Sequence, residues 1–66
     1  MKVYRSKLGT MPAMLQFRHG YKFQPGLRVI YRRVVLVPRS KHWQPIERWE
    51  TGVVRQTEPI LFIDRF

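Results

Sequence analysis

Cationic and aromatic side chains alternate in the segment Phe17 to Phe23, which reads Phe-Arg-His-Gly-Tyr-Lys-Phe. Single-stranded nucleic acids bind to surfaces of this composition, because bases stack on aromatic rings while cations neutralise phosphates. The pattern gives four candidate nucleic-acid-binding residues: Arg18, Tyr21, Lys22 and Phe23. The alternative is structural: the aromatic rings pack in a core, and the two cations are simply solvated.

A second group of candidates, Arg28, Arg32 and Arg33, lies on one predicted strand, residues 27–37. Arg28 and Arg32 share a face and are about 13 Å apart at about 3.3 Å per residue, so that they can contact two phosphates. Arg outnumbers Lys nine to four, and its planar fork suits bidentate phosphate contacts. The alternative is that these Arg keep an edge strand soluble, a task for which Lys is the more usual residue.

The segment 38–46 is predicted to be a long polar loop, and it carries three more candidates: Arg39, Lys41 and Trp43. A Trp in a polar loop either covers the core or contacts a partner, and the sequence leaves both open. Two further cations complete the candidate set, Arg5 and Lys7.

No catalytic or metal-binding set is recognisable. The chain has no Cys, which excludes a thiol nucleophile, a disulfide and a thiolate zinc site. His19 and His42 lack metal-ligand spacing, and no glycine-rich phosphate loop is present. Each acid is close in sequence to an Arg, as structural ion pairs would be. The acids are Glu47, Glu50, Glu58 and Asp64. We therefore expect neither enzymatic activity nor a cofactor.

The charges are divided unevenly along the chain. The first 46 residues contain ten Lys and Arg and no Asp or Glu, whereas all four acids lie in the last 20 residues. The formal net charge of +9 thus comes from the N-terminal block. The cations of such a block repel one another in the isolated protein, and a bound polyanion compensates their charge.

These features predict an accessory RNA-binding or structural protein of a large ribonucleoprotein, with a ribosomal subunit as the favoured assembly and RNA favoured over DNA. Neighbouring proteins of the complex are expected partners. The alternative is a small accessory subunit of a multiprotein assembly, such as a respiratory complex or a phage particle, that binds proteins or anionic surfaces. A third reading is a free DNA-binding regulator or a phage-encoded inhibitor, but the sequence has no recognition helix.

An all-β fold is predicted, because five Pro and four Gly interrupt every long segment. The intervening residues are rich in the Val, Ile and aromatic types that favour strands. The predicted strands are residues 2–5, 14–18 (weakly), 27–37, 49–56 and 60–66, with a hairpin loop at 56–59. Because the alternation in the third strand changes phase, we expect either a bulge near Arg32 and Arg33 or burial on both faces at the far end of the strand.

We expect two parts: an extended basic arm at 1–26, and a small antiparallel β meander at 27–66. In the second part, a Pro-Gly turn leads into a strand (25–29), an aromatic and a glycine precede the next (49–54), and a third follows (60–63). Over about 40 residues this resembles the SH3-like barrels of Tudor-type and ribosomal-type modules, which implies a partly open barrel. Any short β meander produces a similar alternation.

The predicted core consists of Val29, Tyr31, Val35, Trp49, Val53, Ile60 and Phe62. The longest aliphatic run, 34–37, is too short to span a membrane, so no membrane span is expected. No apolar segment of a secretory signal peptide follows Lys2. The acid-free start is compatible with a mitochondrial presequence, but Gly9 and Pro12 interrupt any helix there. We expect an intracellular protein, with the cytoplasm and the mitochondrial matrix both open.

Overall fold

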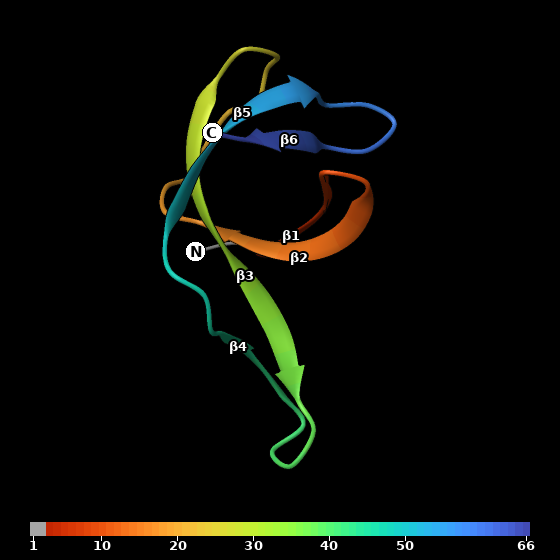
Figure 1. Ribbon diagram of the computed structural model, residues 1–66, viewed down its shortest axis with the longest axis vertical. Coiled ribbons are helices and arrows are strands. Elements are labelled where there is room, and N and C mark those ends of the chain that lie inside the picture. The colour runs from red at the N-terminus through yellow and green to blue at the C-terminus, as the bar shows by residue number, and fades with distance from the viewer. Residues whose placement is uncertain (1–2) are drawn as a thin grey trace.

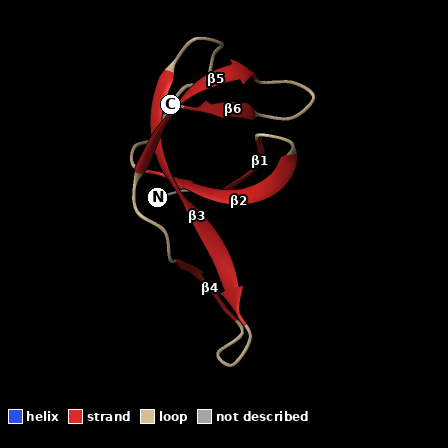
Figure 2. Ribbon diagram, viewed as in Figure 1, coloured by secondary structure: helices blue, strands red, loops and turns tan. Residues whose placement is uncertain are grey.

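The computed structural model describes residues 3–66, and within that range it contains six strands and no helix (Figures 1 and 2). The strands are β1 (Val3–Leu8), β2 (Met11–Phe17), β3 (Arg28–Val37), β4 (His42–Pro45), β5 (Glu50–Gln56) and β6 (Phe62–Arg65). The all-β prediction is confirmed. The predicted hairpin loop lies between β5 and β6, and β4 falls in a segment that was expected to be a loop.

The strands form one mixed sheet. β1 pairs with β2 in antiparallel and with β6 in parallel orientation. β6 pairs with β5, β5 with β3, and β3 with Leu15–Phe17 of β2, all antiparallel. These pairings close a ring of hydrogen bonds that is not a regular barrel. The predicted meander is correct for β3, β5 and β6 but wrong for the whole sheet, because β1 joins β6 in parallel.

The expectation of an extended N-terminal arm is wrong for the residues from Val3 to Phe17, which form the β1–β2 hairpin. Leu8 pairs with Met11, so the turn consists of Gly9 and Thr10, and Gly9 has a φ of 65°. Positive φ favours glycine, so this residue makes a tight hairpin turn where the sequence suggested only a break. Beyond this hairpin, the irregular part of the predicted arm is residues 18–26, and residues 1–2 of the arm lie outside the described range.

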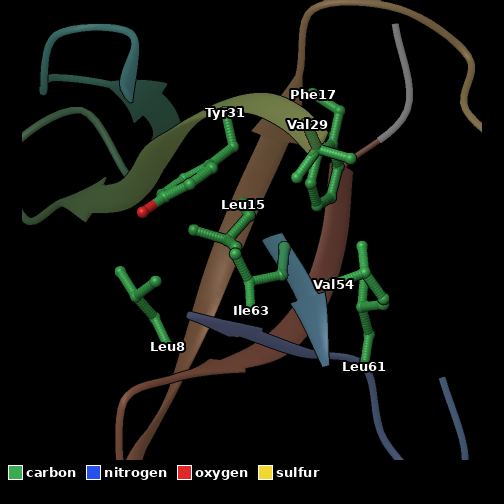
Figure 3. Packing of buried hydrophobic residues seen from close by; sticks show 8 residues of the cluster. All are labelled: Leu8, Leu15, Phe17, Val29, Tyr31, Val54, Leu61 and Ile63. Atoms are coloured by element: carbon green, nitrogen blue, oxygen red, sulfur yellow. The ribbon is translucent and has the colours of Figure 1, made fainter. Parts of the chain in front are cut away.

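The core lies inside the ring, between strands that are distant in the sequence (Figure 3). It consists of Leu8, Leu15, Phe17, Val29, Tyr31, Val54, Leu61 and Ile63. Of the predicted core, Val29 and Tyr31 are confirmed. The other five are only half-buried: Val35, Trp49, Val53, Ile60 and Phe62. Segments 53–54 and 60–63 are apolar on both faces, so the sequence did not reveal which alternate residues point inward.

β4 and β5 follow one another along the same edge of β3. Val34 pairs with Pro45 and Tyr31 pairs with Glu50, so the chain opposite β3 has two extra residues between these pairs. An irregularity is therefore present opposite Arg32 and Arg33, but the extra residues lie between β4 and β5 and not on β3 itself. Beyond it, β3 and β4 extend away from the ring as a long hairpin (Figure 1), and the molecule measures 38 × 21 × 19 Å.

Candidate nucleic-acid interface

Ion pairs across neighbouring strands neutralise most of the acidic block. Arg65 donates three hydrogen bonds to Glu50, from Nε to Oε2 at 3.1 Å and from Nη2 to Oε2 at 2.6 Å and Oε1 at 2.7 Å. Arg55 binds Asp64 in the same bidentate manner, with Nε 2.9 Å from Oδ2. The hydrogen bond from Arg55 lowers the pKa of the Asp64 carboxyl. These acids are therefore structural partners of Arg, although the partner lies on another strand in each case.

A third, looser pair joins Arg33 to Glu47, with Nε 3.7 Å from Oε2. The sequence placed Arg33 in one group with Arg28 and Arg32. The structure separates it, because Arg28 and Arg32 occupy the outward face of β3 while Arg33 continues the opposite face, which carries Tyr31. Arg33 is thus partly compensated by an acid of the protein itself.

Nine Lys and Arg among residues 3–66 have no carboxylate within ion-pair distance. They are Arg5, Lys7, Arg18, Lys22, Arg28, Arg32, Arg39, Lys41 and Arg48. All except Arg48 belong to the acid-free N-terminal block. The charge division of the sequence therefore persists in the fold, because the acids pair with C-terminal or ring-facing Arg and leave the N-terminal cations uncompensated.

Arg32 is the best-positioned of these cations. Its Nε donates a hydrogen bond to the side-chain oxygen Oε1 of Gln16 at 2.8 Å, and its guanidinium carbon lies 4.4 Å from the centre of the Trp49 ring. Stacking on an aromatic face and a single side-chain hydrogen bond fix the plane of the guanidinium. Within residues 3–66, its two terminal nitrogens have no hydrogen-bond acceptor. They can therefore donate to two oxygens of an incoming group such as a phosphate.

Two others of the nine cations without a carboxylate partner also lie over aromatic rings. The Arg28 guanidinium carbon is 4.5 Å from the centre of the Phe66 ring, and Lys7 Nζ is 5.5 Å from the centre of the Phe62 ring. Sequence reasoning predicted that Arg28 and Arg32 share a face, and the structure agrees. It did not predict the rings beneath these cations, because each ring comes from a C-terminal segment far along the chain.

The rings of the segment 17–23 face the core. Phe17 is fully buried, and Phe23 packs edge-on against it with ring centres 4.8 Å apart. The Tyr21 hydroxyl accepts a hydrogen bond from the Ile30 N–H at 3.2 Å. The structural alternative therefore describes these three aromatic residues. The neighbouring cations, Arg18 and Lys22, are exposed.

The β3–β4 hairpin presents the remaining candidates. Arg39 and Lys41 are exposed in its turn, where Lys41 has a φ of 55°. Trp43 lies on β4 opposite Leu36 and is 56% exposed. Residues 42–45 are thus a strand and not part of a loop, and Trp43 does not cover the core. Contact of Trp43 with a partner stays a prediction.

Two adjoining hollows lie between β2 and the β3–β4 hairpin, and we call them together the β2–β3 cleft. One, of about 330 Å³, is lined by Arg5, Pro12, Ala13, Met14 and Trp43. The other, of about 310 Å³, is lined by Pro12, Ala13, Met14, Arg33, Val34, Val35, Leu36 and Trp43. The fold thus brings together a cation and a Trp that are far apart in the sequence. Only the course of the hairpin makes them neighbours.

Comparison with protein-family models, with curated proteins and with solved structures found no match for this chain. Among residues 3–66, no group of three or more His, Cys, Asp or Glu side chains is arranged to hold a metal ion. The same residues include no helix that is long and apolar enough to cross a membrane. The function must therefore be inferred from the charges and surfaces described above.

Proposed function

We propose that the protein binds nucleic acid, with RNA favoured over DNA, as a structural component of a large ribonucleoprotein such as a ribosomal subunit. One observation carries the proposal: the acids pair with Arg33, Arg55 and Arg65, while eight cations of the N-terminal block have no carboxylate partner among residues 3–66. A polyanion supplies the missing countercharge. No catalytic step and no cofactor belong to this proposal.

The proposed mechanism is phosphate neutralisation with limited base stacking. Arg32, held between Gln16 and Trp49, offers a fixed guanidinium fork to a phosphate. The exposed turn of the β3–β4 hairpin adds Arg39 and Lys41 as further phosphate contacts. In sequence, the segments that form β3, β5 and β6 resemble SH3-like barrels. We therefore also propose that the ring serves as a scaffold that holds these cations in position.

Salt dependence tests this proposal directly. If about five cations contact phosphates, the slope of log affinity against log salt should be near −3.5 for a single strand, at about 0.7 per contact. Fluorescence anisotropy with a single-stranded RNA across a range of salt concentrations gives the slope. A slope shallower than about −1 would rule out nucleic-acid binding as the main function.

A charge-conserving substitution tests the role of the guanidinium fork. Replacing Arg28 and Arg32 together by Lys should weaken RNA binding by about 1 kcal/mol or more, because Lys cannot form bidentate contacts. The salt slope should stay nearly constant, since counterion release depends on the number of charges. Arg48→Lys is the matched control, because Arg48 is also exposed and unpaired but lies outside the N-terminal block.

The second candidate is a small accessory subunit that binds other proteins. It is favoured by three exposed apolar side chains on or beside the β3–β4 hairpin: Leu36 (47%), Trp43 (56%) and Ile46 (62%). Nuclease digestion of the native assembly separates the two candidates. Release of the protein supports the ribonucleoprotein, whereas complete retention favours the subunit.

A further inference from the structure

β3 has one main-chain edge that faces β2. On this edge, the Ile30 carbonyl accepts a hydrogen bond from the Arg18 N–H at 3.0 Å, and the Ile30 N–H donates to the Tyr21 hydroxyl. On the opposite edge, the Arg33 carbonyl accepts a hydrogen bond from the Ile46 N–H at 3.4 Å. Even-numbered residues of β3 therefore point their main-chain groups toward β2, and odd-numbered residues point theirs toward β4 and β5.

The β2-facing edge is only partly occupied. β2 pairs with β3 as far as Leu15 opposite Arg33, and then the two strands separate (Figure 1). The direction of the main-chain groups alternates along β3. The N–H and C=O of Leu36 therefore point into the β2–β3 cleft, whereas those of Val35 point toward β4. Among residues 3–66, no strand pairs with Leu36 on this side. The edge therefore offers an unused donor and acceptor.

On the facing edge of β2, Met14 keeps its main-chain groups but Pro12 offers no donor, so this edge pairs less readily than that of β3. Arg18 bonds to β3, so the even-numbered residues of β2 also direct their main-chain groups to this side. Pro12 has no N–H. Its main-chain nitrogen faces the cleft and not β1, so the pairing between β1 and β2 loses no hydrogen bond. An added strand would therefore pair with β3 and pack its side chains against β2.

The lining of the cleft indicates what such a strand carries. Met14, Val34 and Trp43 offer apolar contact, and the only charged residues that line the two hollows are Arg5 and Arg33. A partner with alternating apolar and acidic side chains complements this lining. A second copy of the chain is disfavoured, because its corresponding edge carries the same cations and no acid.

We propose that the β2–β3 cleft binds one extended segment of another protein, with alternating apolar and acidic residues, by adding a strand to β3 at Leu36. This goes beyond the proposed nucleic-acid binding and uses a different partner. The main-chain bonds of Leu36 supply general affinity, Trp43 covers an apolar side chain of the partner, and Arg5 selects for carboxylates.

Amide exchange in the full chain tests the proposal. The probe is a capped peptide of alternating Glu and Val; the controls are a scrambled peptide of equal composition and a version with Lys in place of Glu. The alternating acidic peptide should slow exchange of the Leu36 amide by about tenfold or more, since that amide gains a hydrogen bond. The Val35 amide should change little, because it already faces β4.

Two variants separate the main chain from the side chain. Leu36→Pro removes the unused donor and should weaken peptide binding about tenfold or more, whereas Leu36→Val keeps the donor and should bind almost normally. If Leu36→Pro disrupts the hairpin, Trp43→Thr serves instead and should also lose most of the affinity. Equal binding of the three peptides, or binding without added protection at Leu36, overturns the proposal.

A uridine oligonucleotide, titrated separately, distinguishes this site from the proposed nucleic-acid interface. It should affect Arg28 and Arg32 while the exchange of the Leu36 amide stays unchanged. Slowed exchange at Leu36 with RNA, and not with the acidic peptide, would assign the cleft to nucleic acid and overturn the proposal. Failure of RNA binding alone would leave the peptide result standing, so the two functions fail independently.

Discussion

The Tyr31 ring packs in the core, and the charged groups of Glu50, Arg65 and Arg33 lie near its hydroxyl. The side chain is fully buried, and the hydroxyl makes no hydrogen bond of good geometry among residues 3–66. Burial, and then the nearby charge of Glu50, raise the pKa of this phenol, while Arg65 and Arg33 act in the opposite direction. An unpartnered buried hydroxyl opposes folding, although the ring itself packs well.

Tyr31→Phe should leave stability unchanged or raise it by up to about 1 kcal/mol, since the variant keeps the ring and removes the unsatisfied hydroxyl. The raised pKa means that the folded state favours the neutral phenol. Ionisation of Tyr31 therefore does not affect stability below an unfolded pKa of about 10, and stability is lost as pH rises from there toward the higher folded value. Urea unfolding at neutral and strongly alkaline pH should show less alkaline loss for the Phe variant. A loss above about 1 kcal/mol at neutral pH would contradict this.

Gly52 marks the closest approach between β5 and its neighbours. A Cβ here would lie 2.6 Å from Ile63 Cγ2, 2.8 Å from the Asp64 carbonyl oxygen and 2.9 Å from Tyr31 Cε1. Gly52→Ala should therefore cost about 1–3 kcal/mol by overpacking. Gly20→Ala is the control, because nothing lies within 4 Å of its added carbon. Urea unfolding of both variants checks this, and equal stabilities would mean that the ring has more space than described.

The part of the β3–β4 hairpin that extends beyond the ring, residues 34–45, contributes no residue to the core cluster. Replacing residues 35–44 by a two-residue Asn-Gly turn, which joins Val34 directly to Pro45, should therefore leave the ring folded. The shortened protein loses Arg39 and Lys41, so the magnitude of the salt slope for RNA should fall by about 1.4, at about 0.7 per lost contact. Circular dichroism and anisotropy check the two outcomes. An unfolded product would show that the hairpin supports the ring.

The extent to which each strand was predictable depends on its pattern. β3, β5 and β6 are recognisable because runs of Val, Ile and aromatic residues lie between turn-forming residues. The inward faces of β5 and β6 are not recognisable, since segments 53–54 and 60–63 are apolar on both sides. β1 and β2 do alternate, as Ser6, Leu8, Leu15 and Phe17 show, but the Gly and Pro between them suggested an irregular segment. β4 is polar and gives no signal.

The candidate site was predictable only as a list of cations. The sequence identified Arg28 and Arg32 on a common face, because strand period alone determines this. It could not identify the contacts that fix Arg32, since Gln16 and Trp49 are each more than ten residues away from it. The same holds for Arg5 and Trp43, which meet only through the curvature of the sheet. Contacts between distant segments require the topology, and periodicity does not supply it.

At the scale of the whole molecule, repulsion among uncompensated cations opposes the compact state. The formal net charge is +9, and only three ion pairs are present among residues 3–66. Adding sodium chloride to about 0.2 M should therefore raise the thermal midpoint, because screening weakens the repulsion more than it weakens exposed ion pairs. Thermal unfolding across salt concentrations checks this. A falling midpoint would show that the ion pairs dominate.

The parallel contact between β1 and β6 has a consequence for how the protein is made. Lys7 and Leu8 pair with Phe62 and Ile63 of β6, which are synthesised 55 residues later in the chain. A nascent chain therefore exposes its whole acid-free block before the strand that closes the ring exists. Such non-local closure is slow, on the order of milliseconds to seconds for all-β domains. We expect the ring to close only after β6 has been synthesised, so that a nearby polyanion first meets these cations on an open and still adaptable chain.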